Sequence, residues 1–248
     1  MRRLILTFAC VAPIALVMLW HRSPLAAIGV LMLSHALILI PTLCPNVRWL
    51  GPVVNHFETD EREVWLTIDD GPEDDTEEVL RVLEKHQAKA TFFVKGELVR
   101  AHPDRLRNIV EGGHTIGNHS ETHPAGSFWC LPPSRIAREV DHCSEALRAA
   151  VGSAPSWFRA PVGMKNPAVH PCLAKRGMRL IGWSVRGLDG VSTDVERIVH
   201  RIVPRVRPGF IIVMHQGRET SAHCIDRVVT ELTNQGFSFV VPTDAQLR

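Results

Sequence analysis

The stretch from Leu66 to Pro72 constrains the fold of this chain most strongly, because an apolar segment there ends in two adjacent acids and a Gly-Pro pair. The apolar residues predict a strand, and Gly71 and Pro72 predict a turn directly after it. At such a strand end both Asp69 and Asp70 can face one pocket, where a cation would allow both to ionise. One carboxylate could then bind metal while the other accepts a proton from water. The alternative is an ordinary strand end before a helix N-cap.

Strand-like and helix-like segments alternate through the rest of the chain. We predict strands over residues 64–68, 90–94, 180–185, 210–214 and 237–241. We predict helices over residues 75–86, 103–111, 134–150, 194–203 and 224–234. This alternation is typical of an α/β domain with parallel strands and outer helices, as a barrel or an open sheet. In either architecture, chemistry belongs at the C-terminal ends of the strands.

Two uncharged apolar runs open the chain, over residues 4–20 and 25–44. The first is near the lower limit for crossing a bilayer, and the second meets the usual requirement of about 20 residues. Trp20 and Trp49 stand where interfacial aromatic residues would lie. The runs therefore predict a transmembrane helical hairpin. A cleaved signal peptide and a buried soluble hairpin are the alternatives.

The charges around these runs predict an orientation. Arg2, Arg3 and Arg48 lie on the side shared by the N-terminus and the large domain, against a lone Arg22 in the turn. By the positive-inside rule, we expect a protein of the bacterial cytoplasmic membrane with its large domain on the cytoplasmic side. If only one run spans, the domain lies outside. The predicted parts are a membrane anchor over residues 1–45, a linker over 46–63 and a domain over 64–248.

Composition excludes some classes of protein. The formal charge of +2, with scattered lysines and arginines, argues against a nucleic-acid partner. The cysteines form no CxxC pair, so neither a cysteine zinc site nor a disulfide framework is expected. Free thiols in turn favour a reducing compartment. The cysteines are Cys10, Cys44, Cys130, Cys143, Cys172 and Cys224.

His119 and His123 are candidate metal ligands in a glycine-containing loop after a helix. On a helical turn, imidazoles four residues apart share one face and can bind one ion. Together with Asp70 they would form a three-ligand site that suits zinc or a similar divalent ion and leaves positions open for water and substrate. In a chain with 13 histidines, a chance pair is the alternative.

Two further residues fit the same site. Arg159 is the one arginine in an otherwise apolar, kinked segment over residues 157–163, and His215 lies just past a buried strand. Judged alone, each has an ordinary structural explanation: a surface arginine on a turn and a capping histidine. Their value lies in their combination with the acids and histidines above.

These segments together resemble a known family. Residues 67–72, 119–123, 159–163 and 213–215 are similar, in order, to four of the five motifs of the polysaccharide deacetylases, the NodB-homology or carbohydrate esterase family 4. The strand over residues 90–94 also matches, and the similarity covers about residues 64–246. The resemblance implies a deformed (β/α) barrel with about seven strands. It also implies metal-dependent hydrolysis of an N-acyl, usually N-acetyl, group on an amino sugar.

The resemblance implies a role for each residue. The ligands of the divalent metal, zinc or a similar ion such as cobalt, would be Asp70, His119 and His123. Asp69 would be the general base, Arg159 would pair with it, and His215 would be the general acid. The Val162 backbone N–H would help to stabilise the oxyanion. The complete set of substrate and oxyanion contacts would be Pro161, Val162, Trp183, Arg186, Asp189 and Met214.

The chain departs from the family pattern at its fourth motif, residues 183–190. The family usually has Asp at the position of Arg186 and Trp at that of Gly190. A cation in place of the acid is expected to lower the pKa of His215 and weaken it as an acid, unless Asp189 takes over. Val162 replaces a usual Tyr, and the chain has no tyrosine. These changes bear on the substrate more than on the hydrolysis.

Several functions stay open at this point. A membrane-held site facing the cytoplasm would suit an N-acylated amino sugar on a polyprenyl-phosphate lipid, with Arg186 contacting the phosphate. A site facing outward would suit peptidoglycan or an exported glycan. The alternatives are a catalytically impaired, glycan-binding member of the same fold and a deformylase acting on a formamido sugar.

Overall fold

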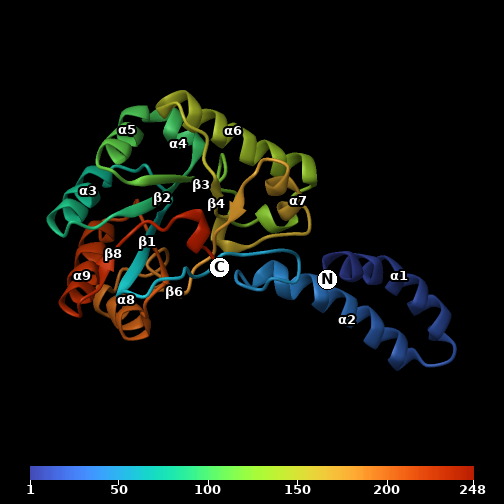
Figure 1. Cartoon of the computed structure of the whole chain (residues 1–248). Coiled ribbons are helices and arrows are strands. Elements are labelled where there is room, and N and C mark those ends of the chain that lie inside the picture. The colour runs from blue at the N-terminus through green and yellow to red at the C-terminus, as the bar shows by residue number, and fades with distance from the viewer.

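The computed structural model describes residues 1–248, which form an N-terminal helical hairpin and an α/β domain (Figure 1). The hairpin consists of α1 (Arg2–Trp20) and α2 (Pro24–Leu43), which pack against each other and project from the domain. Pro24 lies in the first turn of α2, and the Ser23 side chain accepts a hydrogen bond from the Ala26 N–H, as is usual at a helix start. Both helices are long and apolar enough to cross a membrane.

The outer faces of this hairpin are apolar and exposed. Large side chains that face away from the protein include Leu4, Val17, Met18, Leu25 and Met32. Few residues of the hairpin are buried, among them Ile5 and the small Ala12 and Ala27. The alternative of a hairpin buried in a soluble protein is therefore wrong, because the domain does not cover it.

Eight short strands form a wholly parallel sheet. Seven follow one path in the order β5-β4-β3-β2-β1-β7-β6, and β8 pairs with β1. Because β5 and β6 end this path, the barrel is open between them. The predicted deformed (β/α) barrel with about seven parallel strands is confirmed. The strands are β1 (Glu63–Asp69), β2 (Ala90–Val94), β3 (Thr115–Asn118), β4 (Trp157–Phe158), β5 (Arg179–Leu180), β6 (Val185–Arg186), β7 (Ile211–His215) and β8 (Ser238–Phe239).

Helices cover the outside of this sheet (Figure 1). They are α3 (Thr76–Lys85), α4 (Gly96–Ala101), α5 (Pro103–Glu111), α6 (Pro133–Val151), α7 (Val169–Ala174), α8 (Val195–Ile202) and α9 (Ser221–Asn234). The central strand β1 is apolar on both faces: Leu66 and Ile68 belong to the large core that includes helix residues, and Trp65 belongs to a separate inner cluster. A strand buried on both faces explains why residues 64–68, which precede Asp69, are apolar apart from Thr67.

The structure corrects two predictions along the chain and adds elements that were not predicted. The strand predicted over residues 180–185 is two strands, β5 and β6, because residues 181–184 pass from one end of the sheet to the other. Residues 115–118, predicted as loop, form β3. A Cβ on Gly117 would lie 2.5 Å from Phe93 Cε1, so this glycine reflects close packing within the sheet rather than a turn. The short helices α4 and α7 were not predicted.

The segment between the hairpin and β1 lies against the domain. It buries Leu50, Val53, Val54 and Phe57, each at most 4% exposed. All six cysteines are free, as the sequence predicts. The end of α2 is therefore followed by packed chain, so the hairpin and the domain are joined closely.

Candidate active site

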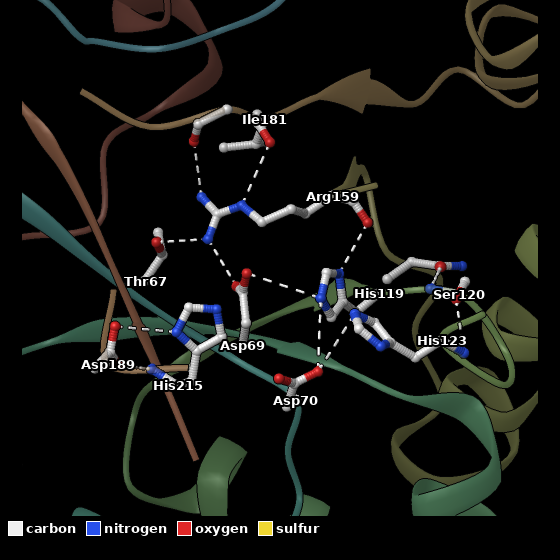
Figure 2. Close-up of polar contacts among 12 residues, drawn as sticks. Thr67, Asp69, Asp70, His119, Ser120, His123, Arg159, Ile181, Asp189 and His215 are labelled. Atoms are coloured by element: carbon white, nitrogen blue, oxygen red, sulfur yellow. Dashed lines mark hydrogen bonds and ion pairs between the residues drawn. The ribbon is translucent and has the colours of Figure 1, made fainter. Parts of the chain in front are cut away.

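The predicted site residues meet at the C-terminal ends of four parallel strands. Asp69 is the last residue of β1 and pairs in register with His215, the last residue of β7. His119 directly follows β3, and Arg159 directly follows β4. These ends open onto a cavity of about 330 Å³. The predicted site residues therefore lie close together at the edge of the sheet where the sequence places the chemistry (Figure 2).

Three donors lie close enough to share one ion. The ligand atoms of Asp70, His119 and His123 all lie within 4.8 Å of one another. Asp70 Oδ1 is 3.5 Å from His123 Nε2 and 3.8 Å from His119 Nε2, and this buried oxygen has no hydrogen-bond partner. An unpartnered buried carboxylate oxygen that faces two imidazole nitrogens fits a divalent cation with mixed nitrogen and oxygen ligands.

The two histidines reach this position from an irregular loop. Residues 119–123 form a loop, as predicted, but this loop is not a helical turn, because Ser120 and His123 have positive φ angles of 70° and 47°. The His119 Nδ1–H donates to the Arg159 carbonyl oxygen at 2.9 Å, which leaves Nε2 free as a ligand. The sharp loop brings the rings together, with centroids 4.7 Å apart.

The protonation states favour metal binding. Burial lowers the pKa of His123 to about 4, and nearby His119 acts in the same direction. Burial alone would raise the pKa of the Asp70 carboxyl, but the charges of His119, His123, His215 and Lys95 together hold this pKa below its usual value. At neutral pH His123 is therefore neutral and Asp70 is ionised, which are the forms that bind metal ions.

Asp69 is held by a buried arginine. Arg159 is fully buried, and its Nη1 donates to Asp69 Oδ1 and to Thr67 Oγ1, each at 2.7 Å. Its Nη2 donates to the Gly182 carbonyl oxygen at 2.8 Å, and its guanidinium lies 4.2 Å from the centre of the Phe93 ring. The other oxygen, Asp69 Oδ2, lies 3.8 Å from His119 Nε2 and so faces the three donors. Arg159 is thus a core residue and not the surface arginine of the alternative.

His215 has an acidic partner. Its backbone N–H donates to Asp189 Oδ2 at 2.6 Å, and its Nδ1–H donates to Asp189 Oδ1 at 3.2 Å. Burial by itself would lower the pKa of His215, but the hydrogen bond and charge of Asp189 raise this pKa to about 9. The expected net lowering of the His215 pKa by Arg186 is therefore wrong, and the carboxylate in contact with His215 is that of Asp189.

The remaining predicted residues divide between the cavity and the core. Val162, Trp183 and Arg186 line the cavity, whereas Asp189 does not line it and contacts His215. Val162 has a left-handed backbone with φ 47°. Pro161 and Met214 do not line the cavity; Met214 is fully buried in the core beneath the sheet.

Part of the lining was not predicted from the sequence. The residues that were not predicted are Ala125, Gly163, Leu188, Gly190, Val191, Val213 and Arg218. Arg218 is the one with distinctive chemistry: it is exposed, and its Nη2 donates to the Gly190 carbonyl oxygen. The signal for it was a cation three positions after the strand-end His215, which is too common a pattern to single out alone.

Comparison with known proteins identifies the relatives of this chain. The model of the polysaccharide deacetylase family matches residues 56–181. A chitooligosaccharide deacetylase from Bradyrhizobium sp. (strain ANU 289) is 37% identical over 185 residues, which cover 73% of this chain and 84% of the relative. The solved structure of the peptidoglycan N-acetylglucosamine deacetylase Bc1960 matches with a TM-score of 0.69 and 28% identity, over 75% of this chain and 88% of that one.

A solved structure described as a pseudoenzyme is also similar. It is a carbohydrate esterase family 4 pseudoenzyme from Bacillus anthracis, which matches with a TM-score of 0.69 and 26% identity, over 76% of this chain and 66% of that one. The same fold is therefore found with and without catalytic activity.

Proposed function

The chain belongs to the polysaccharide deacetylase family, and from this premise we propose that it hydrolyses an N-acyl group, chiefly N-acetyl, on an amino sugar of a cell-envelope or lipid-linked glycan. One observation carries the proposal: the base Asp69, held by Arg159, and the acid His215 face the same cavity as three convergent metal-ligand donors. A site for water activation and a site for amine protonation thus flank one position where an amide can bind.

Asp69 is the proposed base. Its Oδ1 is taken up by Arg159, which stabilises the ionised carboxylate, so Oδ2 is the atom that accepts the proton from water. Held by Asp70, His119 and His123, a divalent ion such as zinc or cobalt would polarise the acyl carbonyl and lower the pKa of water. The Val162 N–H would stabilise negative charge on the carbonyl oxygen.

His215 is the proposed acid. Because its Nδ1–H is bound to Asp189, its Nε2 is the atom that can deliver a proton into the cavity. The raised pKa keeps the imidazolium populated at neutral pH, so His215 can protonate the departing amine. Asp189 acts through His215 and is a positioning residue.

The substrate is proposed to lie at a membrane surface. The length and apolar composition of α1 and α2 support a membrane anchor. Arg186 and Arg218 line the cavity, are exposed and pair with no carboxylate, so neither positive charge is neutralised and each can contact a phosphate, although Arg218 Nη2 also donates to the Gly190 carbonyl oxygen. This combination favours an amino sugar carried on a polyprenyl phosphate over a neutral polymer, with the catalytic domain on the cytoplasmic side.

The phosphate contact can be tested by kinetics. Arg186→Ala should raise the KM for a polyprenyl-phosphate amino sugar by about 10-fold, the scale of one charged hydrogen bond, and leave the KM for the sugar fragment unchanged. Arg148→Ala, which removes an exposed arginine from α6, is the matched control. Equal effects of Arg186→Ala on the two substrates would argue against a phosphate contact.

The acyl group decides between the enzymatic alternatives. The full-length protein in detergent would be given N-acetyl and N-formyl glucosamine oligomers of equal length, and released acetate and formate would be measured. We expect acetate release; formate alone would make the protein a deformylase. Release of neither, with metal bound stoichiometrically, would favour a glycan-binding role like that of an inactive family member.

A further inference from the structure

Lys165 is an unusual lysine close to the catalytic cavity. Its side chain is fully buried, although lysine is almost never buried unless it is paired. Its partners are two backbone carbonyl oxygens and no carboxylate: Nζ donates to Pro45 O at 2.7 Å and to Cys44 O at 3.0 Å. Both acceptors lie just past the end of α2, so this cation joins the domain to the hairpin.

The backbone of Lys165 makes a third bond to the same place. Its N–H donates to Thr42 O at 3.1 Å, in the last turn of α2. The last carbonyls of a helix lack partners within the helix, and a cation there is favourable. Burial lowers the pKa of Lys165 to about 8, so the ammonium form predominates at neutral pH. One residue of the domain therefore satisfies three carbonyls at or beyond the helix end.

The same segment packs behind the cavity wall. A Cβ on Gly163 would lie 2.7 Å from Pro45 Cγ and 2.4 Å from Trp183 Cη2, so these three residues are in tight contact. The Asn46 side chain donates from Nδ2 to the Trp183 carbonyl oxygen at 2.7 Å. Gly163 and Trp183 both line the cavity, and Gly163 directly follows Val162.

We infer that Lys165 is a positioning residue that fixes the Val162–Gly163 loop to the end of α2, so that the second apolar helix holds one wall of the catalytic cavity. The catalytic consequence rests on the proposed function, but the attachment does not. The positive φ of the β-branched Val162 is a strained conformation that persists only where the surrounding structure holds it. The domain is then not suspended on a flexible tether, and the orientation of its cavity relative to α2 is fixed.

Amine labelling tests the attachment without requiring activity. The full-length protein in detergent is treated with an amine-acylating reagent, and modification is followed at Lys165 and at exposed Lys175 by peptide mass spectrometry. Because a lowered pKa increases the reactive amine fraction, an accessible Lys165 would react faster than Lys175. We expect Lys165 to react at least about 10-fold more slowly, because its amine is buried and bound. Equal or faster labelling of Lys165 would overturn the proposal.

Kinetics test the positioning role. Lys165→Met keeps an unbranched side chain but removes the donor, and Lys175→Met is the control. On a small soluble N-acetylated substrate, we expect Lys165→Met to lower kcat by about 10-fold, less than the cost of displacing a catalytic group by about 1 Å. KM and bound metal should stay within about 2-fold, as for loss of an interaction made in the transition state. An unchanged kcat would refute the role. If the parent protein is inactive on every substrate, the proposed function fails, and labelling alone decides whether the attachment exists.

Discussion

The two sides of the catalytic cavity differ in how closely they follow the family motifs. On one side, Asp69 and Arg159 and the three metal-ligand donors are all of the expected types and lie in contact with one another. On the other side, Arg186 stands where the family usually has Asp, yet His215 keeps a carboxylate partner in Asp189. The groups that would perform the hydrolysis are therefore complete, and the changes lie where the rest of the substrate would bind.

Removal of the metal should have the largest effect on activity. It acts only on the side of the cavity that holds Asp69, Arg159 and the three metal-ligand donors. A chelator should reduce deacylation to background, and zinc or cobalt should restore it, because the three donors are arranged for one divalent ion. The far-UV circular dichroism should not change, since these donors sit at the ends of strands already paired in the sheet. Activity that remains after complete removal of metal would contradict the role proposed for these three donors.

The next effect separates the base from the ligands. Asp69→Asn should lower kcat by about 10³-fold, within the range for loss of a general base, while bound metal stays constant. Asp70→Asn is the matched variant, and we expect it to lose metal as well as activity. Metal content from elemental analysis and kcat from amine release measure the two outcomes. Full activity in Asp69→Asn would remove the base from the mechanism.

The pH dependence of activity tests the other side of the cavity, where Asp189 contacts His215, and the expected effect is smaller. The acid must be protonated, so activity falls as pH rises through the pKa of His215, which Asp189 raises to about 9. Asp189→Asn removes that charge, so burial dominates and the alkaline limb of kcat/KM should move down by about 1–3 pH units. An alkaline limb that stays in place would show that Asp189 does not tune the acid.

The smallest expected effect comes from changing Arg186, the residue that departs from the family pattern. Arg186→Asp restores the residue type usual in the family, but the structure already gives His215 its acidic partner. We therefore expect the alkaline limb of kcat/KM to stay in place and kcat on a soluble sugar to change by less than about 3-fold, as for a residue outside the reacting groups. A large gain in kcat would mean that the altered motif impairs catalysis.

The two sides of the cavity also differ in how well the sequence predicts them. Asp69 with Asp70, and His119 with His123, lie in short motifs at strand ends that can be recognised in the sequence, although the pairing of β1 and β3 with β2 brings the two motifs together. The choice between Arg186 and Asp189 as the neighbour of His215 is not local. It depends on the parallel register of β6 with β7, in which Arg186 pairs with Val213 and Asp189 lies past the strand end.

The fold shows the same limit. Long alternating segments predicted parallel strands with outer helices, and the family resemblance implied the barrel, but two-residue strands such as β5 and β6 carry no periodic pattern of their own. The hydrogen bond from Lys165 to Pro45 joins residues 120 positions apart, and neither segment has a sequence pattern that predicts this contact. Contacts of this kind depend on how finished elements pack, which single-sequence patterns do not encode.

The most direct test of the account is deacylation itself. The full-length protein in detergent, stripped of metal or reloaded with zinc or cobalt, would be given N-acetylglucosamine oligomers, peptidoglycan and polyprenyl-phosphate amino sugars, and released amine would be measured. The account predicts metal-dependent release from at least one class, with the strongest release from the phosphate-linked sugar. No amine release from any of these substrates, with metal bound stoichiometrically, would contradict the proposed deacylase function.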